Sequence, residues 1–425
     1  MGKHVRAEVH IAKQGKGAVL ARVFLLAFLA VTLFLTSSFV FAYSRLQSNI
    51  DQGDISNLLD NGQKVPRDPQ EGHDYNILVL GSDSRAGDSN IDGAVGDLGE
   101  NSMRSDTTMI VHISADRSHA EIVSIPRDTL TTIPSCTVRK SKNSKETYNT
   151  AQSRNTQFNW AFSRGGETGD VASAAACAIK TTERLTGLTI NGYIVVNFAA
   201  FQDIVNALGG VPMYFDKEVK DPMSGLHVLE GCRLLDGEQA LAFARARKNI
   251  GDGSDTGRIG RQQELVAAMF REVLDMNLLT DSYNLYRTLD AGTQSLSTSK
   301  GLGDLTTLVG LLYSLRSIDM ENIHFITMPY TAAPSDPNRV VPTQKAEKVW
   351  SAIANDTPVW IAEDGSVVTQ DSQQSTSSPS DGAPAQSSAQ PSATTPAPAS
   401  SPSASSTTSA PVCTKQNALK ANNDK

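Results

Sequence analysis

Six charged residues stand at the ends of three short apolar runs in the first third of the chain. They are Asp83 and Arg85, Arg104 and Asp106, and Arg127 and Asp128. The runs lie at 76–82, 107–111 and 122–126, and their Val and Ile residues, bounded by polar ones, are typical of strands in one buried sheet. If the strands are neighbours, carboxylates and guanidinium groups meet at one rim of that sheet. Such a rim can hold a divalent metal ion beside a polyphosphate.

The two aspartates at this rim, Asp83 and Asp106, are the predicted metal ligands. Mg²⁺ is typically held by one or two carboxylates together with phosphate oxygens and water molecules. The alternative is that both residues cap turns, as Asp often does, but the arginines that flank them favour the metal. The predicted cofactor is therefore Mg²⁺, or Mn²⁺ in its place. The general base is left open, because Asp128 and both metal-bound carboxylates are candidates.

A second group of arginines lies farther along the chain, at Arg245, Arg247, Arg258 and Arg261. Arg258, Arg261 and Gln262 are spaced so that they share one face at the start of a predicted helix. Helix N-termini favour anions through free backbone N–H groups, and a guanidinium binds a pyrophosphate through two hydrogen bonds at once. Any one of these arginines could instead form a surface ion pair. As a set, they predict a second phosphate clamp.

An uncharged run at 23–43 is long enough to cross a bilayer core of about 30 Å as a helix. Lys and Arg residues outnumber acidic ones ahead of it, an asymmetry that places the N-terminus in the cytoplasm. A cleaved signal peptide is the alternative, although its apolar region would normally be about 7 to 15 residues. We expect a cytoplasmic segment at 1–22, an uncleaved signal anchor at 23–43, and a single-pass protein of the cell membrane with its remainder outside.

The rest of the chain divides by composition into three parts. Residues 44–73 are polar and are interpreted as a juxtamembrane stalk. In residues 74–362, strand patterns alternate with helical ones, which predicts one α/β domain. Residues 363–425 are mostly Ser, Thr, Pro, Ala and Gln, so they are interpreted as a disordered tail or a spacer through the wall.

Charge and motif content narrow the function classes. The formal net charge of the chain is −7 although its first 22 residues are basic, so the exported part is strongly acidic. An acidic body disfavours nucleic acid as a partner, because nucleic-acid affinity rests largely on neutralised phosphates. The sequence has no G-x-x-x-x-G-K-[ST] phosphate loop and no H-E-x-x-H zinc motif. The histidines are scattered, and His112, on a predicted strand, is interpreted as a core or rim residue rather than a catalyst.

The exported part contains four cysteines, Cys136, Cys177, Cys232 and Cys413. Disulfides persist outside the cytoplasm, and four cysteines allow three pairings. We favour the pair Cys136 and Cys177, because both flank the same basic loop at 136–157. The alternative is that Cys177, in an Ala-rich helical stretch, is simply a small buried residue.

Five motifs together resemble the LytR-CpsA-Psr family of bacterial envelope proteins. In order, they lie at 76–85, 104–107 (Arg-Ser-Asp-Thr), 125–128 (Ile-Pro-Arg-Asp), 236–247 and 255–262. The resemblance covers roughly residues 74–354 and implies an α/β/α sandwich with a central mixed sheet. It also implies a polyprenyl-pyrophosphate-linked glycan as substrate, with the membrane lipid tail in an apolar tunnel and the pyrophosphate on Mg²⁺ and arginines.

The resemblance assigns roles by motif. Asp83 and Asp106 take the metal, and Gln262 orients the phosphate-binding arginines, which are Arg85, Arg127, Arg245, Arg247, Arg258 and Arg261. The catalytic set at the rim consists of Asp83, Asp106, Arg127 and Asp128, with Arg104 as a further phosphate contact. The implied activity is a phosphotransfer that moves a glycopolymer from the lipid carrier to a hydroxyl of peptidoglycan, or of a surface protein.

Two other functions are weighed against the transferase. The same residues could hydrolyse the lipid-linked pyrophosphate without an acceptor, and only the fate of the glycan separates the two activities. The chain could also be a transcriptional attenuator, a label that members of this family have carried. The outside placement, the acidic body and a cytoplasmic segment without a helix-turn-helix pattern disfavour that reading. The glycopolymer, the oligomeric state and the role of the tail are left open.

Overall fold

The computed structural model describes residues 16–60, 72–82, 103–246, 255–275, 286, 290, 292–293, 296–370 and 413–423. The chain divides into two compact units, residues 1–48 and residues 49–425. Three residues of the predicted site, Asp83, Arg85 and Arg247, lie outside the described residues. Part of the predicted stalk and most of the predicted tail also lie outside them.

The first unit consists of helix α1 (Lys16–Asn49), which contains the whole predicted membrane span. Within Leu20–Asn49, an 18-residue window has a mean hydropathy of 2.4, so the helix is long and apolar enough to cross a membrane. Phe24, Phe34 and Phe41 are each 69% exposed. Large apolar side chains on the surface of a helix fit lipid surroundings better than water. By length and composition, α1 fits a signal anchor and a signal peptide equally well.

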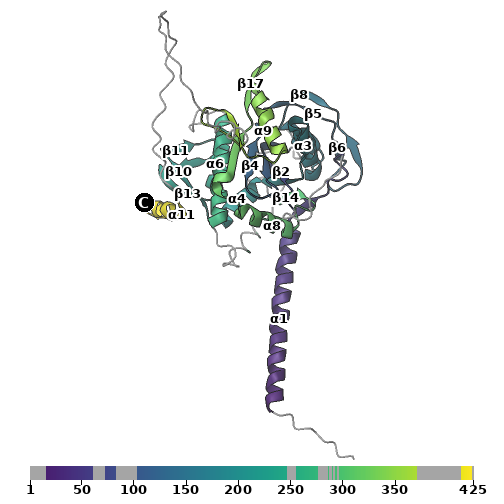
Figure 1. The fold of residues 1–425 in the computed structure, drawn as a ribbon, viewed down its shortest axis with the longest axis vertical. Helices are drawn as coiled ribbons and strands as arrows, with labels where there is room; N and C mark the ends of the chain where they lie inside the picture. Colours follow the sequence, from purple (N-terminus) through teal and green to yellow (C-terminus); the bar gives the residue numbers. More distant parts are fainter. Residues whose placement is uncertain are drawn as a thin grey trace, which may run out of the picture. The chain divides into compact units, whose positions relative to one another are not determined.

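The second unit is built around a seven-stranded mixed sheet in the order β1-β14-β9-β2-β3-β4-β15 (Figure 1). The strands are β1 (Asp51–Gly53), β14 (Leu296–Ser299), β9 (Gly192–Asn197), β2 (Tyr75–Ser82), β3 (Ser105–Ile113), β4 (Ala120–Ser124) and β15 (Ile323–Thr327). β2 pairs in parallel with β9 and antiparallel with β3, and β4 pairs antiparallel with β3 and in parallel with β15. The three apolar runs are therefore adjacent strands of one sheet, and the α/β fold class is confirmed.

The strand directions bring the ends of these three strands together. Ser82, the last residue of β2, pairs with Ser105, the first residue of β3, and β4 ends on the same side at Ser124. We call this side the Asp106 end of the sheet. The opposite side, where β2 and β4 begin, is called the His112 end.

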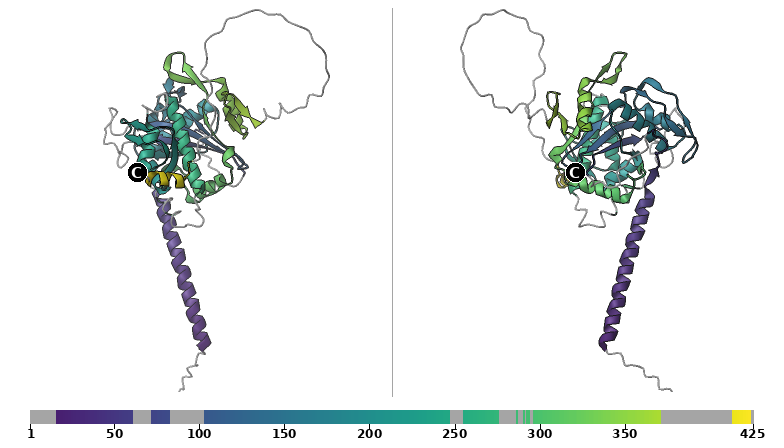
Figure 2. Two further views of the ribbon diagram at one scale, coloured as in Figure 1. Left: turned by 90° about the vertical axis from the view of Figure 1, so that its left-hand side faces the viewer. Right: turned by 45° about the vertical axis from the view of Figure 1, so that its right-hand side comes forward.

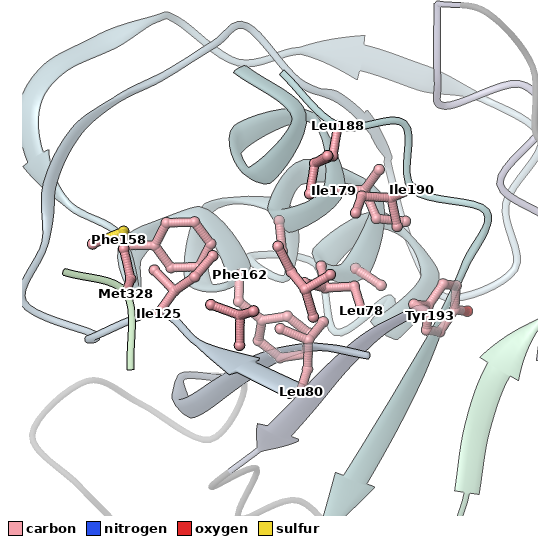
Figure 3. Packing of buried hydrophobic residues seen from close by; sticks show 14 of the residues in the cluster. Leu78, Leu80, Ile125, Phe158, Phe162, Ile179, Leu188, Ile190, Tyr193 and Met328 are labelled. Carbon is pink, nitrogen blue, oxygen red and sulfur yellow. The ribbon is translucent and has the colours of Figure 1, made fainter. Parts of the chain in front are cut away.

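One face of the sheet carries the main hydrophobic core. Leu78, Leu80 and Ile110 point to this face and pack with residues of α3 (Val171–Thr186) and α9 (Gln344–Ala354). Figure 3 shows the side chains of Leu78 and Leu80 beneath those of the covering helical layer. Because the three side chains are fully buried, each contributes about 1.5 to 3 kcal/mol of burial free energy.

The other face is covered by two helices. Ile77, Met109 and Ile122 point to this face, where they cluster with residues of α8 (Leu305–Arg316) and α6 (Asp255–Asp275). α6 also contributes to a second cluster together with α4 (Phe198–Ala207), α5 (Gly237–Arg245), β10 (Val211–Phe215) and β13 (Gly231–Leu235). Helices on both faces of a mixed sheet make the layered arrangement that the family resemblance implies.

Small two-stranded sheets accompany the central sheet. Their strands are β5 (Leu130–Ile133) with β8 (Ser153–Gln157), β6 (Thr137–Arg139) with β7 (Thr147–Asn149), β11 (Val219–Asp221) with β12 (Leu226–Val228), β16 (Tyr330–Ala333) with β17 (Asp336–Pro342), and β18 (Val359–Ile361) with β19 (Val367–Thr369). Short helices form at α2 (Trp160–Gly165) and Met320–Asn322. Half of the basic segment 136–157 is thus paired strand, whereas its Ser, Asn and Lys content suggests a loop.

Two disulfides link distant parts of the second unit. Cys136 bonds to Cys177, as predicted, and joins the outer hairpins to α3. Cys232 bonds to Cys413 and joins β13 to the segment that leads into α11 (Lys415–Asn423). Figure 2 shows α11, in yellow, beside the teal strands β10 and β13, which pair with each other. The end of the predicted tail is therefore a helix fixed to the domain. Strands β18 and β19 pair with each other across residue 362, where the predicted domain ends.

Candidate functional site

A pocket of about 550 Å³ lies between the sheet and helices α4, α5 and α6. Most of its lining is apolar, and it includes Phe201, Ile204, Leu208, Leu265, Met269 and Val273. Its polar side chains include Asp106, Asn197, Arg245, Arg258 and Gln262. Four of the predicted site residues therefore share one cavity, although they come from three separate elements.

Several polar lining residues lie at the Asp106 end of the sheet, while Asp221 and Ser224 line the pocket from the region of β11 and β12. Asp106 lies at the start of β3, and Asn197 is the last residue of β9, which ends beside β2. On α6, Gln262 is followed by Gln263, whose amide donates to Oγ of Ser124 at 3.0 Å. The pocket therefore has a polar end and an apolar body. An amphiphile with an anionic head group and a hydrocarbon tail requires this division.

Asp106 occupies an irregular position in the sheet. Gly81 pairs with Thr107, and the residue after Gly81 pairs with Ser105, so Asp106 is the extra residue of a β-bulge. Bulges change the direction of a side chain and are common beside active sites. Nη1 of Arg127 donates to Oδ1 of Asp106 at 2.9 Å, and the Asp106 side chain is 32% exposed. The structure thus brings these two predicted residues together and leaves the carboxylate open to a ligand.

Asp128 lies behind this pair and is surrounded by donors. Arg339 Nη1, from β17, donates to its Oδ1 at 2.6 Å, and Gln157 Nε2, from β8, donates to the same oxygen at 2.7 Å. Its Oδ2 lies 3.4 Å from Nε of Arg127. These contacts hold the Arg127 guanidinium from the side opposite Asp106. The position suits a residue that orients Arg127 better than one that takes a proton from substrate.

Arg104 points away from the pocket lining toward an aromatic ring. Its guanidinium carbon lies 5.4 Å from the ring centroid of Trp160, within the range of a cation–π contact. The Trp160 indole N–H donates to Oε1 of Gln157 at 3.0 Å, and the residue is 40% exposed. Since Gln157 also binds Asp128, the Arg104 and Trp160 pair is joined to the rim through one side chain.

On α6, the residues of the predicted phosphate clamp have two different roles. Arg258 is buried and lines the pocket. Arg261 Nη2 instead donates to the carbonyl oxygen of Ala246 at 2.6 Å, just past the end of α5. Gln262 lines the pocket and also reaches the carbonyl oxygen of Ala244, at 3.4 Å. Arg261 and Gln262 therefore hold the end of α5 in place.

The Asp236-Gly237 motif has a structural explanation. Asp236 forms a capping box at the start of α5. A Cβ atom on Gly237 would lie 2.5 Å from the carbonyl oxygen of Gln202, so glycine allows α5 to pack closely on α4. This packing brings the far end of α5 to the pocket, where the guanidinium of Arg245 lies 4.9 Å from the ring centroid of Phe198.

Comparison with known proteins agrees with this geometry. The model of the LytR_cpsA_psr family matches residues 42–355, which is most of the chain. The chain belongs to the LytR-CpsA-Psr family. The family resemblance inferred from the five motifs is therefore confirmed.

Two curated relatives of the LytR-CpsA-Psr chain are informative. The cell wall biosynthesis protein LcpA of Corynebacterium glutamicum is 30% identical over 264 residues, which cover 60% of this chain and 50% of LcpA. The polyisoprenyl-teichoic acid–peptidoglycan teichoic acid transferase TagU of Bacillus anthracis is 33% identical over 220 residues, which cover 52% of this chain and 59% of TagU. The chain thus spans only about half of the length of these relatives. The crystal structure of TagT from B. subtilis is 24% identical, with a TM-score of 0.47, and covers 70% of this chain and 98% of TagT.

The LytR-CpsA-Psr motif residues therefore fall into three groups. Asp106, Arg245, Arg258 and Gln262 line the pocket, and Arg127 binds Asp106. Three others, Arg104, Asp128 and Arg261, contact residues around the pocket rather than lining it. The last three, Asp83, Arg85 and Arg247, lie outside the described residues.

Sequence reasoning missed several residues of this site. Arg339 and Gln157 bind Asp128, yet they lie 211 and 29 residues away from it along the chain. Trp160 belongs to none of the five motifs. Asn197 left a usable signal, because it ends a strand and its side chain caps α4 by accepting from the backbone N–H of Ala200.

Proposed function

We propose that this protein transfers a cell-wall glycopolymer from a polyprenyl-pyrophosphate carrier to a hydroxyl group of peptidoglycan, forming a phosphodiester. The observation that supports it best is the pocket, whose apolar body ends in Asp106 and arginines. A polyprenyl chain fits the apolar part, and a pyrophosphate fits the cationic end. The names of LcpA and TagU agree with such a role in the cell wall.

The polar end of the pocket fits Mg²⁺. Mg²⁺ prefers carboxylate oxygens, phosphate oxygens and water, and Asp106 presents a carboxylate to the pocket. Asp83 follows directly after Ser82, the residue that pairs with the first residue of β3. We propose that Asp83 and Asp106 hold the ion, or Mn²⁺ in its place. When bound, the ion supplies charge neutralisation at the pyrophosphate oxygens.

The side chains of the pocket account for the remaining needs of the reaction. In the transfer, the acceptor oxygen forms a bond to the phosphorus next to the glycan, and the bond from that phosphorus to the bridging oxygen breaks. Polyprenyl phosphate leaves, and the acceptor hydroxyl loses its proton. Negative charge grows on the leaving oxygen, and the guanidinium groups of Arg127, Arg245 and Arg258 stabilise it. Asp128 positions Arg127 for this task.

We also propose that α1 is an uncleaved signal anchor and that the catalytic domain, from about residue 74, lies outside the cell. The run at 23–43 supports an anchor, because it is longer than the apolar region of an ordinary signal peptide. The two disulfides support an oxidising compartment.

The test uses the full chain in lipid vesicles with Mg²⁺, a glycan-labelled polyprenyl-pyrophosphate donor and purified peptidoglycan. We expect label to become covalently attached to peptidoglycan, and the attachment to require both Mg²⁺ and Asp106. Label released into solution in the presence of acceptor would instead establish a pyrophosphatase. The Asp203→Asn variant, in which an exposed carboxylate of α4 outside the pocket lining is replaced, serves as the control and should remain active.

A further inference from the structure

A second cluster of ligating side chains lies at the His112 end of the sheet. It consists of His112, His119 and Glu121, and Asp356 lies next to it, 3.0 Å from Nε2 of His112. His112 is six residues beyond Asp106 on β3, so the two positions are about 20 Å apart along the strand. The cluster faces α9 and β18, whereas the pocket lies on the side of α6. It is therefore separate from the candidate transferase site.

The three members of the cluster are buried and close together. His112, His119 and Glu121 are 0%, 4% and 0% exposed, and their ligating atoms lie within 4.8 Å of one another. The sheet itself creates this proximity, because His112 on β3 pairs directly with Glu121 on β4. His119 precedes Glu121 by two residues, so its side chain points to the same face.

Hydrogen bonds fix which nitrogen of His112 is available as a ligand. Its Nδ1 lies 2.8 Å from Oδ1 of Asn76, and the amide nitrogen of Asn76 is directed to Asp74 instead. Because an amide oxygen only accepts, Nδ1 of His112 carries the proton. Its Nε2 faces Oδ1 of Asp356 at 3.0 Å. The contact requires a cation, which is either a proton on Nε2 or a metal ion bound next to both atoms.

The same arrangement recurs at His119. Its Nδ1 lies 3.0 and 3.1 Å from the two oxygens of Glu121. A buried carboxylate without a balancing cation is costly. The neighbouring imidazole of His324, which pairs with Glu121 from β15, stacks on Trp360 rather than entering the cluster. Two imidazole nitrogens and one buried carboxylate thus converge on one small volume, and the carboxylate of Asp356 lies beside His112.

We propose that this cluster binds a Zn²⁺-class divalent metal ion through His112 Nε2, His119 Nδ1 and Glu121, with Asp356 beside the ion. Two imidazoles and a carboxylate form a donor set that suits zinc and does not suit Mg²⁺, which prefers oxygen ligands alone. The carboxylates of Glu121 and Asp356 also neutralise the charge of the ion. The hydrogen bond from His112 to Asn76 is the outer contact that typically orients a ligating imidazole.

The site would tie three separate parts of the domain together. His112 and Glu121 belong to the central sheet, and His119 lies in the turn between β3 and β4. Asp356 follows α9, 244 residues after His112, and its Oδ2 accepts from the backbone N–H of Ala115 at 3.1 Å. A metal ion here would stabilise the attachment of the C-terminal part of the domain without taking part in transfer.

The test measures zinc bound to the full chain in detergent after loading with Zn²⁺ and dialysis. We expect about one equivalent of tightly bound zinc in the wild type, and none in His119→Ala or Glu121→Gln. Asn76→Ala should bind zinc about 10- to 100-fold more weakly, because it loses only the outer contact. His227→Ala, which removes an exposed histidine paired with Glu218, is the matched control and should keep its zinc.

Substitution with Co²⁺ provides a second readout, because cobalt in a tetrahedral site absorbs visible light. It applies to the wild type and Asn76→Ala even if the variants of buried ligands fail to fold. Wild-type protein that retains no zinc would overturn the proposal and leave two protonated histidines as the cations of the cluster. Zinc retained fully by a folded Glu121→Gln variant would overturn it equally.

Discussion

The two ends of β3 carry polar clusters of opposite design. At one end, Asp106 is one-third exposed, contacts Arg127 and borders a pocket. At the other, His112 and Glu121 are fully buried, and their partners are acids and imidazoles. An open carboxylate among arginines leaves room for an anion together with its metal ion. A closed group of carboxylates and imidazoles leaves room only for a cation.

The largest expected effect is at the open end. Replacement of Asp106 by Ala should reduce the rate of glycopolymer transfer at least about 100-fold, as loss of a transition-state electrostatic contact does. Its zinc content and melting temperature should stay close to those of the wild type, because its side chain is partly exposed. A transfer assay and a thermal melt on the same preparation test the loss of rate and the unchanged melting temperature. An unfolded Asp106→Ala variant would remove the distinction between the two ends.

Asp128 tests whether the open end depends on orientation as well as charge. Asp128→Asn weakens the hold on Arg127, so transfer should fall by about 10- to 100-fold, the cost of a small misplacement of a catalytic group. The loss should appear in kcat, while the affinity for the lipid donor stays unchanged. Arg339→Ala should lower kcat in the same direction. A change confined to donor affinity would mean that Asp128 contributes to binding rather than positioning.

After metals are removed, different ions should restore the properties that depend on each end of β3. Chelation is expected to abolish transfer and to lower the melting temperature. Mg²⁺ alone should then restore transfer at a temperature below the melt, and Zn²⁺ alone should restore the melting temperature. Zinc at 100 times its dissociation constant would contribute about 2.7 kcal/mol to stability. If a single ion restored both transfer and the melting temperature, the assignment of Mg²⁺ to the Asp106 end and Zn²⁺ to the His112 end would be wrong.

The smallest effect concerns a buried carboxylate at neither end. Burial alone would raise the pKa of Asp170, but hydrogen bonds from Ser173 and the backbone of Asn143, with the charge of Arg139, hold that pKa below its usual value. Its contribution is therefore present above about pH 4 and is lost as pH falls through the lowered folded-state pKa. Because Asp170 also caps α3, Asp170→Ala should cost about 1 kcal/mol at pH 7.

Urea unfolding of the wild type and Asp170→Ala at neutral and acidic pH measures this contribution. The difference in the free energy of unfolding should shrink as the pH is lowered below 4, while transfer at pH 7 stays near the wild-type rate. A difference that persists undiminished in acid would mean that packing, and not the carboxylate, stabilises the start of α3.

The sequence was sufficient to predict the open end because its signals are local. β2, β3 and β4 are each a run of branched apolar residues, and their polar ends identify the rim directly. Asp106 could be placed at a strand end, but the β-bulge that directs its side chain depends on the register with β2, which no local pattern records. The pairing of Cys136 with Cys177 was predictable for the same local reason.

The closed end could not be predicted, because its members meet only through the fold. His112 and Glu121 become neighbours through the register of two strands, and Asp356 arrives from a turn 244 residues away. His112 therefore looked like an isolated core residue. The end of the tail was missed for a similar reason: its composition predicts disorder, and only the bond between Cys413 and Cys232 places α11 against β13.

The central claim is a phosphotransfer at the Asp106 end, and a donor labelled in its glycan-proximal phosphate tests it most directly. The account predicts that this phosphate enters peptidoglycan together with the glycan in equal amounts, while unlabelled polyprenyl phosphate is released. The transfer should be lost in Asp106→Ala and unaffected in His227→Ala. Glycan that enters peptidoglycan without the labelled phosphate, or labelled glycan phosphate that accumulates free in solution, would contradict it.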